Sequence, residues 1–366
     1  MDRVVGHIDL DYFYAQVEEV ENPSLKERPV IVCVFSGRTE DSGVVSTANY
    51  KARGFGVHSG MPIVQAKKNL ENENPAIIRM NHEKYEVVSA RIMDLVADKV
   101  DALEPTGIDE AFFDLTNSTS GDYSAARRTA EGIKQAIFDA EKLTSSVGLG
   151  RSKVVAKLCS DMAKPGGLKV VLPAETESFL APLPVGALYG VGPKTNATLE
   201  EAHITTVGAL AGADIGEIES KLGRKLAAYL VAAARGEDPD PVRGDLEPTQ
   251  FSRIVTLKHD TTDPEEVITQ LSEGVKHIQD KLTSSGKSFK TLTAIAILTD
   301  LSTKTRSKTF EIPVRGEDII AENAVELFDE LSSTTDREFR RVGIRVSAFS
   351  DEKDQKSLAD FLRPEG

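Results

Sequence analysis

The periods at which apolar and polar residues alternate predict the order of strands and helices along the chain. Residues 4–11 alternate with a period of two, so they predict a strand with Asp9 and Asp11 on the same side. A helical spacing of apolar residues begins directly afterwards, and Pro23 ends it. The chain therefore opens with a strand that runs into a helix and carries two carboxylates on one face.

The same patterns continue to residue 163 and predict the topology of the first domain. Adjacent acids, Asp109 and Glu110, lie between two apolar runs that alternate as the strands of a hairpin. Further strands are expected at 29–35, 44–47 and 144–149, and helices at 62–69, 85–100, 125–141 and 153–163. The order strand, helix, strand, strand, helix, strand, interrupted once, predicts a split βαβ, ferredoxin-like sheet in a multi-domain chain of α/β and α+β class.

The second half of the chain changes character twice. Residues 172–240 are rich in Ala, Leu and Gly at helical spacing and contain no convincing strand pattern. Residues 237–249 hold three prolines and five acids, which predicts an exposed linker. Strands expected at 251–258, 291–300, 304–312 and 337–349 then alternate with two helical segments, which predicts a small α+β domain. Residues 351–366 read as a polar tail.

Composition limits the partners that the protein can have. Lys and Arg number 44 against 58 Asp and Glu, giving a net charge of −14, so any contact with nucleic acid must be local. No segment reaches the roughly 18 consecutive apolar residues of a membrane span. Asp2, Arg3 and Asp9 lie where a signal peptide would need an apolar centre, so we expect a cytoplasmic protein without a membrane partner. Cys33 and Cys159 lie in apolar surroundings without metal-ligand spacing, which predicts buried thiols.

Three carboxylates predict a metal site on the first sheet. Taken singly, Asp9, Asp109 and Glu110 could be solvated residues at strand ends. The first strand and the hairpin are expected neighbours, however, so the three acids should converge on one surface. Clustered carboxylates repel one another unless a divalent cation neutralises them, and hard oxygen ligands that also bridge to phosphates suit Mg²⁺. The pattern therefore predicts a metal platform for phosphoryl transfer.

Several motifs, in order along the chain, resemble those of one enzyme family. They are "HIDLDYFYAQVE", "VVSTANYKARGFGVHSGMP", "GIDEAFFDL", "VGLGRSKVVAKLCSDMAKPGG" and "LYGVGPKTNATLE". Together they resemble the Y-family, translesion DNA polymerases of the DNA polymerase IV group, close to the archaeal enzymes, over residues 1 to about 349. Each motif alone is weak, but their agreement in order is not expected by chance.

The resemblance implies a right-hand polymerase and its division into domains. The implied palm spans residues 1–12 and 80–171, and the implied fingers span 13–79. A helical thumb with a helix-hairpin-helix motif is implied at 172–240, followed by a linker at 241–248, a little finger at 249–350 and a tail at 351–366. The implied activity is template-directed addition of dNTPs to primer-template DNA, with tolerance of damaged bases, low fidelity and no proofreading. Two Mg²⁺ ions would serve as cofactors, Mn²⁺ can substitute, and the enzyme would act as a monomer.

The resemblance also implies roles for individual residues around the nucleotide. Asp9, Asp109 and Glu110 would be catalytic and would hold the metals with the carbonyl of Leu10, whereas Asp11 would support the site. The spacing of three between Thr47, Tyr50 and Arg53 gathers phosphate-binding groups on one side of a helical start, and Lys164 supplies a second cation. Tyr14 would be the steric gate against ribonucleotides. The other implied nucleotide contacts are Tyr12 and Phe13, and the implied roof over the nascent base pair is Gly43, Val44, Ser46 and Gly60.

DNA and clamp contacts are expected outside the catalytic sheet. The glycines Gly190 and Gly192 fit a hairpin that binds phosphates through backbone N–H groups. Two strands near the C-terminus carry basic residues expected to face the DNA backbone: Lys304, Arg306, Lys308, Arg337, Arg340, Arg341 and Arg345. The tail matches a sliding-clamp-binding pattern at Gln355, Leu358, Phe361 and Leu362, although Leu362 replaces the second aromatic residue.

Two other classes of protein share part of this pattern. A nucleotidyl cyclase with a palm would need the metal acids but neither the hairpin between helices nor the basic strands. A non-catalytic scaffold for DNA and clamp binding would keep the fold but tolerate the loss of a metal acid. All three acids are present, which favours the polymerase.

Overall fold

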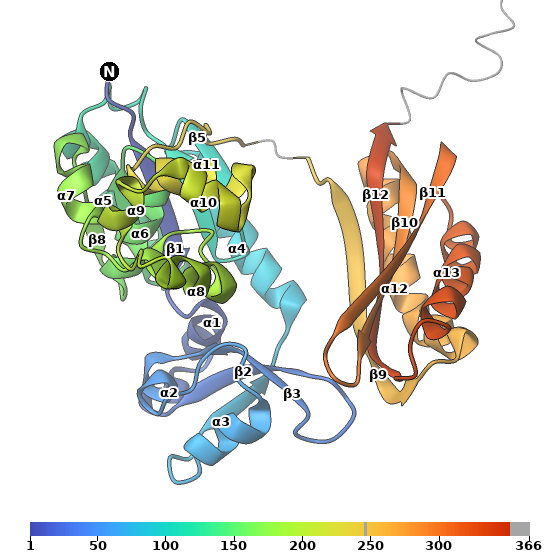
Figure 1. Cartoon of the computed structure of the whole chain (residues 1–366). Helices are drawn as coiled ribbons and strands as arrows, with labels where there is room; N and C mark the ends of the chain where they lie inside the picture. The colour runs from blue at the N-terminus through green and yellow to red at the C-terminus, as the bar shows by residue number, and fades with distance from the viewer. Residues whose placement is uncertain (245–246, 352–366) are drawn as a thin grey trace, which may run out of the picture. The chain divides into compact units, whose positions relative to one another are not determined.

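The structure is a computed structural model and describes residues 1–244 and 247–351 (Figure 1). It divides into two compact units. One comprises residues 1–34 and 44–246, and the other comprises residues 35–43 and the chain from Glu247 onward. In the described part of the chain, no helix is long and apolar enough to cross a lipid bilayer.

A five-stranded sheet forms the centre of the first unit and has the predicted topology. Its order is β5-β6-β1-β7-β8, and β1 pairs antiparallel with both β6 and β7. The strands are β1 (Val5–Leu10), β5 (Ala102–Pro105), β6 (Glu110–Asp114), β7 (Ser145–Gly150) and β8 (Leu168–Val170). The first four give the split βαβ arrangement, so this prediction is confirmed. The strand β8 was not predicted because three half-buried residues carry too short a pattern.

Helices pack on both faces of this sheet, and the alternation along β1 decides which residues meet which helices. Ile8 and Leu10 pack in one core with α1 (Phe13–Glu21), α4 (His82–Ala97) and α5 (Tyr123–Glu141). The opposite face, with Asp9, lies against α6 (Lys153–Ala163), which approaches closely at Gly148. A Cβ at Gly148 would lie 2.1 Å from the Ala156 carbonyl oxygen. This glycine therefore allows α6 to lie directly beside the carboxylates.

The rest of the first unit consists of a small sheet and a group of helices. Three strands, β2 (Val30–Phe35), β3 (Gly43–Ala48) and β4 (Ala76–Arg79), associate in the order β3-β2-β4 beside α2 (Tyr50–Gly54) and α3 (Ile63–Asn69). The strand β4 was not predicted. The predicted helical region forms α7 (Thr176–Leu180), α8 (Pro193–Glu201), α9 (Val207–Ala211), α10 (Ile215–Leu222) and α11 (Arg224–Ala234). Their apolar faces share a core with residues of α6.

Part of the segment expected as an exposed linker lies against the first unit. Val242 is buried with Val5, Phe112 and Ala156. Arg3 donates hydrogen bonds to the carbonyl oxygens of two aspartates in the same segment, Asp238 and Asp240. The proline and acid content did not show this, because a single apolar residue is enough to hold an extended segment on an apolar surface.

The second unit is a four-stranded antiparallel sheet with two helices on one face (Figure 1). The strands are β9 (Gln250–Thr261), β10 (Lys287–Leu298), β11 (Thr303–Val314) and β12 (Phe339–Asp351), in the order β11-β10-β12-β9. The helices are α12 (Pro264–Ser285) and α13 (Glu317–Ser332). Their buried leucines, isoleucines and valines form the core with alternate residues of the strands.

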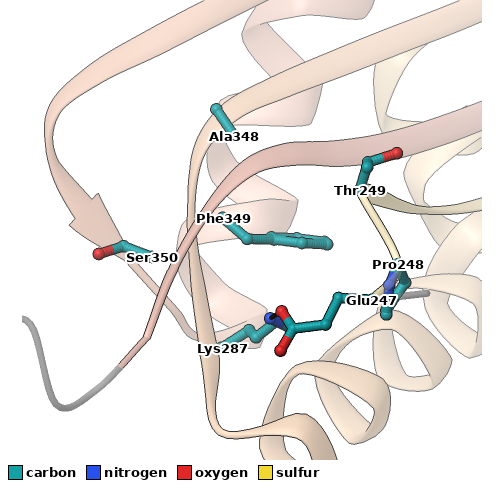
Figure 2. A pocket seen from close by; sticks show the side chains of 7 residues that line it. All are labelled: Glu247, Pro248, Thr249, Lys287, Ala348, Phe349 and Ser350. Carbon is teal, nitrogen blue, oxygen red and sulfur yellow. Dashed lines mark hydrogen bonds and ion pairs between the residues drawn. The ribbon is translucent and has the colours of Figure 1, made fainter. Parts of the chain in front are cut away.

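An ion pair holds the chain where it enters this unit. The Lys287 ammonium is 2.5 Å from the Glu247 carboxylate and 6.0 Å from the centre of the Phe349 ring. Figure 2 shows these three side chains converging on a pocket of about 540 Å³. Lys287 is only 7% exposed, so Glu247 compensates a charge that would otherwise be costly to bury.

Candidate active site

The predicted acids lie together where β1 meets β6. Asp9 and Glu110 are directly opposite one another in the antiparallel pair, so their side chains share one face. The Leu10 N–H donates to the Asp109 carbonyl oxygen at 2.8 Å, which fixes the turn that carries the third acid. The predicted convergence of the first strand and the hairpin is therefore observed.

Two lysines, one in α6 and one directly after it, form ion pairs with Asp9 and Glu110. The Lys164 ammonium is 2.6 Å from Asp9 Oδ2, and the Lys157 ammonium is 2.7 Å from Glu110 Oε2 and 3.7 Å from Asp9 Oδ2. Asp161 lies between them, 3.4 Å from Lys157 and 3.1 Å from Lys164. Lys157 and Asp161 are one turn apart in α6, and Lys164 directly follows the helix, so the three charges lie next to one another.

The protonation of the acids reflects burial and mutual repulsion. Burial raises the pKa of Asp9, which is 7% exposed, although hydrogen bonding to Lys164 opposes the shift. Burial and then the charges of Asp9 and Glu110 raise the pKa of Asp109 to about 6. Among the described residues, no three His, Cys, Asp or Glu side chains stand close enough together to hold a metal ion in this arrangement. The positive charge beside Asp9 and Glu110 comes from the ammonium groups of Lys164 and Lys157.

Asp11 accepts hydrogen bonds that stabilise the strand junction. Its Oδ1 accepts from the Ser146 hydroxyl at 2.7 Å. Its Oδ2 accepts from the Thr144 hydroxyl at 2.7 Å and from the Gly166 N–H at 2.9 Å. These contacts connect β1 to β7 and to the turn after Lys164, so Asp11 helps to position that lysine.

His7 lies beneath Glu110 and was missed from the sequence. It is fully buried, and burial followed by the charges of Lys157 and Lys164 lowers its pKa to about 2, so the imidazole is neutral. Its Nδ1 is 2.7 Å from the Ser160 hydroxyl, which itself donates to the Lys157 carbonyl. The other ring nitrogen, Nε2, is 3.6 Å from Glu110 Oε2. A single histidine in a strand carries no pattern that could have identified this role.

A polar cavity of about 290 Å³ adjoins the acids and contains most of the predicted nucleotide contacts. Its lining residues are Asp9, Leu10, Tyr12, Phe13, Tyr14, Ser46, Thr47, Tyr50, Arg53, Ser59, Asp109 and Lys164. Ser59, which was not predicted, donates to the Ser46 carbonyl at 2.7 Å. Among the residues expected to form the roof, Ser46 lines the cavity and Gly43, Val44 and Gly60 do not.

The cationic side of the cavity is ordered by short local contacts. Arg53 Nε donates to the Ala48 carbonyl at 2.8 Å, and its guanidinium lies 5.1 Å from the centre of the Tyr50 ring. Asn49 caps α2 through the Ala52 N–H and also accepts from the Val30 N–H. The start of α2 is therefore fixed to β2, and Arg53 and Tyr50 point from it into the cavity.

The Tyr14 ring is held by a second aromatic ring. It stacks on Tyr85 of α4 with ring centres 4.4 Å apart and an angle of 18° between the planes. The Tyr85 hydroxyl donates to Glu18 Oε1 at 2.6 Å, so Tyr85 is itself fixed. Tyr85 was expected only as a helical residue, because its contact with Tyr14 joins positions far apart in the sequence.

The glycine turn of the helical region has backbone geometry that requires glycine. Gly190 has a φ of 91°, and Gly192 caps the N-terminus of α8 without a side-chain hydrogen bond. The Tyr229 hydroxyl donates to the Tyr189 carbonyl at 3.2 Å and supports this turn from α11. The backbone N–H groups at the start of α8 are therefore available to an anion.

The two basic strands of the second unit present their charges on opposite faces of the sheet. In β11, Lys304, Arg306 and Lys308 are opposite the buried Ala296, Ala294 and Leu292, so they share the helix-covered face. Two of them reach acids of α13: Lys308 is 2.7 Å from Glu326, and Arg306 is 4.0 Å from Glu330.

Arg341 and Arg345 of β12 lie on the other face. Arg341 and Arg345 are opposite Ile297 and Thr293, out of phase with the buried Val342, Ile344 and Val346. Arg337 is paired with Asp300, and Arg340 is 3.3 Å from Asp260. The alternation within each strand was predicted, but the face to which it points depends on the pairing register. The clamp-binding pattern, Gln355, Leu358, Phe361 and Leu362, lies outside the described residues.

Comparison with family models and curated proteins finds matches over most of the chain. Residues 8–161 match the impB/mucB/samB family, and residues 248–359 match the C-terminal domain of that family. The chain is 40% identical to DNA polymerase IV of Methanosarcina acetivorans, with 99% of this chain and 100% of the relative covered. It is 38% identical to DNA polymerase IV of Saccharolobus solfataricus, with 94% and 96% covered.

Solved structures of DNA polymerases are also similar to this chain. A Y-family DNA polymerase chimera of Dbh and Dpo4 is similar with a TM-score of 0.90 and 34% identity, over 95% of this chain and 100% of the other. An insertion ternary complex of Dbh DNA polymerase has a TM-score of 0.70 at 34% identity, with the same coverage.

The raised pKa of Asp109 predicts a stabilising substitution. The folded-state pKa is about 6 against an ordinary 3.8, so the folded state favours the protonated carboxyl and loses stability as pH rises through this interval. Asp109→Asn should therefore stabilise the metal-free protein at pH 7.5, by on the order of 2 kcal/mol, and should flatten the dependence of stability on pH between about 4 and 6. Thermal unfolding in the presence of a chelator measures both effects.

Asp11→Asn provides the matched control. Its carboxylate accepts three hydrogen bonds, so an amide there should destabilise the protein by about 1–3 kcal/mol. A lower unfolding temperature for Asp109→Asn at pH 7.5 would contradict the assigned repulsion.

Proposed function

Because the chain belongs to the Y family of DNA polymerases, we propose that Asp9, Asp109 and Glu110 are its catalytic metal-binding acids. The chain is a DNA-directed DNA polymerase for translesion synthesis. The observation that supports the assignment most strongly is the pairing of Asp9 and Glu110 beside a polar cavity that contains Arg53 and Lys164.

The donor set fits divalent cations. Three carboxylates and the nearby Leu10 carbonyl are hard oxygen ligands, and the pKa of Asp109 is raised partly because its neighbours repel it. We therefore assign to these residues two Mg²⁺ ions, for which Mn²⁺ can substitute. When bound, the ions would supply Lewis-acid activation of the primer hydroxyl and charge stabilisation at the leaving phosphate. Lys157 and Lys164 orient Glu110 and Asp9 through ion pairs at 2.7 and 2.6 Å.

The cavity residues bind the nucleotide in this proposal. Arg53 offers forked donors to phosphate oxygens, Lys164 a point charge, and Thr47 and Tyr50 neutral hydroxyl donors. Tyr12 and Phe13 complete the lining. Because Arg53 is already held by the Ala48 carbonyl, little conformational entropy is lost when it binds phosphate.

The stacked Tyr14 ring would form the floor beneath the sugar and reject a 2′-hydroxyl. The small residues Gly43, Val44, Ser46 and Gly60 would form the roof over the base pair. A roof without bulky side chains tests base-pair shape weakly, so lesion tolerance and low fidelity have the same physical origin.

Removal of a metal acid tests the chemistry. Asp109→Ala or Glu110→Ala should abolish primer extension in Mg²⁺ because each removes an oxygen ligand, while primer-template binding stays near that of the unmodified enzyme. Single-turnover incorporation of one nucleotide measures the loss. Asp114→Ala is the matched control on the same strand, since that carboxylate accepts only a local turn hydrogen bond from Thr116 among the described contacts. Incorporation at a near-normal rate by either active-site variant would refute the assignment.

Replacement of Tyr14 tests the sugar gate. Tyr14→Ala removes the ring that meets the 2′-hydroxyl, so the ratio of kcat/KM for a ribonucleotide to that for its deoxynucleotide should rise at least ~10-fold. Steady-state incorporation opposite an undamaged template measures the ratio. Tyr14→Phe keeps the stacked ring on Tyr85 and should leave the ratio unchanged; an unchanged ratio for Tyr14→Ala would place the gate on Tyr12 or Phe13.

We assign the DNA backbone contacts to two regions. The turn with Gly190 and Gly192 presents backbone N–H groups to a phosphate. In the second unit, Arg341 and Arg345 lie on the sheet face that is free of helices, whereas Arg306 and Lys308 are engaged by acids of α13. Arg341 and Arg345 are therefore the stronger candidates for DNA contact.

The salt dependence of primer-template binding distinguishes the two faces of the sheet in the second unit. Arg341→Ala with Arg345→Ala should reduce the magnitude of the slope of log K against log[salt] for primer-template binding by about 1–2, because each phosphate contact contributes about 0.9. The charge-matched control, Arg306→Ala with Lys308→Ala, should change the slope by less than half as much. Equal effects of the two double variants would show that both faces contribute equally.

The tail motif is proposed to bind the sliding clamp. Gln355, Leu358, Phe361 and Leu362 would place an apolar plug in a pocket of the clamp, and tethering would raise the effective concentration of the enzyme at the primer end. Since Leu362 replaces an aromatic residue, the affinity should be lower than that of a double-aromatic motif.

Truncation tests the clamp contact. An enzyme that lacks residues 353–366 should extend primers distributively at the normal rate but lose its stimulation by the cognate clamp. Product lengths with and without loaded clamp measure this. Stimulation that survives the truncation would assign the clamp contact to another surface.

A further inference from the structure

A second pocket adjoins the candidate active site and is not explained by the metal acids or by the nucleotide contacts. It has a volume of about 340 Å³ and lies between α1, the start of α2 and the C-terminal end of α5. Tyr12 and Tyr50 line both this pocket and the cavity beside the acids. Their rings are in edge contact, with centres 5.0 Å apart, so this ring pair is the wall that separates the two spaces.

Three lysines from separate segments surround the second pocket. Lys26, Lys51 and Lys142 all line it. Within the described residues, Lys26 has no ion pair, and Lys51 has only a 3.4 Å contact with the exposed Glu27. Lys142 donates to the Asp139 carbonyl at 2.9 Å and lies 5.7 Å from the centre of the Phe138 ring. These contacts leave most of the positive charge uncompensated.

The one acid that lines the pocket is fully engaged. Glu19 is 5% exposed, its Oε1 accepts from Asn49 Nδ2 at 2.8 Å, and its Oε2 accepts from the Tyr12 hydroxyl at 3.1 Å. Glu19 thus holds the wall between the two spaces and does not pair with the lysines. Three ammonium groups around one pocket, in a chain of net charge −14, form a local site for a polyanion.

We propose that this lysine-lined pocket receives the inorganic pyrophosphate released by nucleotide addition and directs it to solvent. The inference rests on the proposed function. In that reaction the primer 3′-hydroxyl loses its proton to water, its oxygen forms a bond to the α-phosphorus, and the bond from the α-phosphorus to the bridging oxygen breaks. The electron pair stays on the bridging oxygen and leaves with pyrophosphate. The leaving group is a polyanion formed beside Arg53 and Lys164, and three further cations lie beyond the Tyr12–Tyr50 wall.

The geometry favours release over substrate binding as the role of the pocket. A nucleotide in the cavity is held by Arg53 and Lys164, whereas Lys26, Lys51 and Lys142 do not line that cavity. A second set of cations stabilises a freed polyanion without binding the ground-state triphosphate more tightly. Product release limits turnover in many enzymes. A second binding site for pyrophosphate, between the cavity and solvent, would therefore speed turnover.

Neutralising the three lysines tests the proposal. By microscopic reversibility, added pyrophosphate must enter by the route along which it leaves. The triple variant Lys26→Gln, Lys51→Gln, Lys142→Gln should therefore need about 10-fold more inorganic pyrophosphate for half-inhibition of primer extension. Its pyrophosphorolysis rate at subsaturating pyrophosphate should fall by a similar factor. Single-turnover incorporation and the dNTP concentration for half-maximal rate should stay within twofold of the unmodified enzyme.

A charge-matched triple variant controls for the change in net charge. Lys99→Gln, Lys276→Gln and Lys281→Gln remove three exposed lysines elsewhere and should leave pyrophosphate inhibition unchanged. The single variant Lys142→Gln, with an expected two- to threefold effect, covers the case in which the triple variant is poorly folded.

Three outcomes would overturn the proposal. One is an unchanged half-inhibitory concentration for both the triple and the single variant. Another is an equal shift in the control triple, which would assign the effect to net charge. The third is a large loss of dNTP affinity in the triple variant, which would make the lysines part of the triphosphate site. Failure of the unmodified enzyme to extend primers would instead refute the polymerase function itself, so the two failures are distinguishable.

Discussion

The site depends on one electrostatic constraint: carboxylates of like charge are partly buried at the junction of β1 and β6. Asp9 and Glu110 are directly opposite each other, and Asp109 directly precedes Glu110 in the turn before β6. Such a cluster is unfavourable unless cations accompany it. The ammonium groups of Lys157 and Lys164 supply this compensation at 2.7 and 2.6 Å. Divalent ions would compete for the same oxygens, so the site is organised for cations before any of them binds.

The position of α6 is what makes the compensation possible. A side chain at Gly148 would collide with the backbone of α6, so the absence of a Cβ there allows the helix to lie on the strand. Asp11 then anchors the turn after Lys164 through the Gly166 N–H, and His7 contacts α6 through Ser160. Residues in or directly after the strand that carries Asp9 therefore hold the C-terminal part of α6 and the turn that follows it, which position Lys157 and Lys164. Strand β1 thus carries Asp9, and residues in it or directly after it contact the segment that carries Lys157 and Lys164.

The same reasoning explains how an acidic protein can handle polyanions. At several sites in the described structure, basic side chains lie where the neighbouring acids are engaged by other groups. Glu19 is bonded to Asn49 and Tyr12, and the acids of α13 engage the basic side chains of β11. Arg341 and Arg345 remain on the open face of the sheet, and Lys26, Lys51 and Lys142 remain around the pocket beyond Tyr12. Local geometry rather than net charge therefore decides where phosphate can bind.

The sequence alone determined most of the elements, the topology of the central sheet and the three candidate acids, because period, turn residues and strand order are local signals. The short strands β4 and β8 were not predicted. The sequence also grouped Thr47, Tyr50 and Arg53, which line one cavity, but Thr47 lies in β3 and only Tyr50 and Arg53 belong to α2. Lys157, His7 and Tyr85 could not be found in this way, because each acts on a residue distant in the chain through packing of α6 or α4. Only the tertiary structure decided that the charges of β11 and β12 face opposite ways. Alternation fixes which residues of a strand share a face, whereas the pairing register and the helices fix which face is covered.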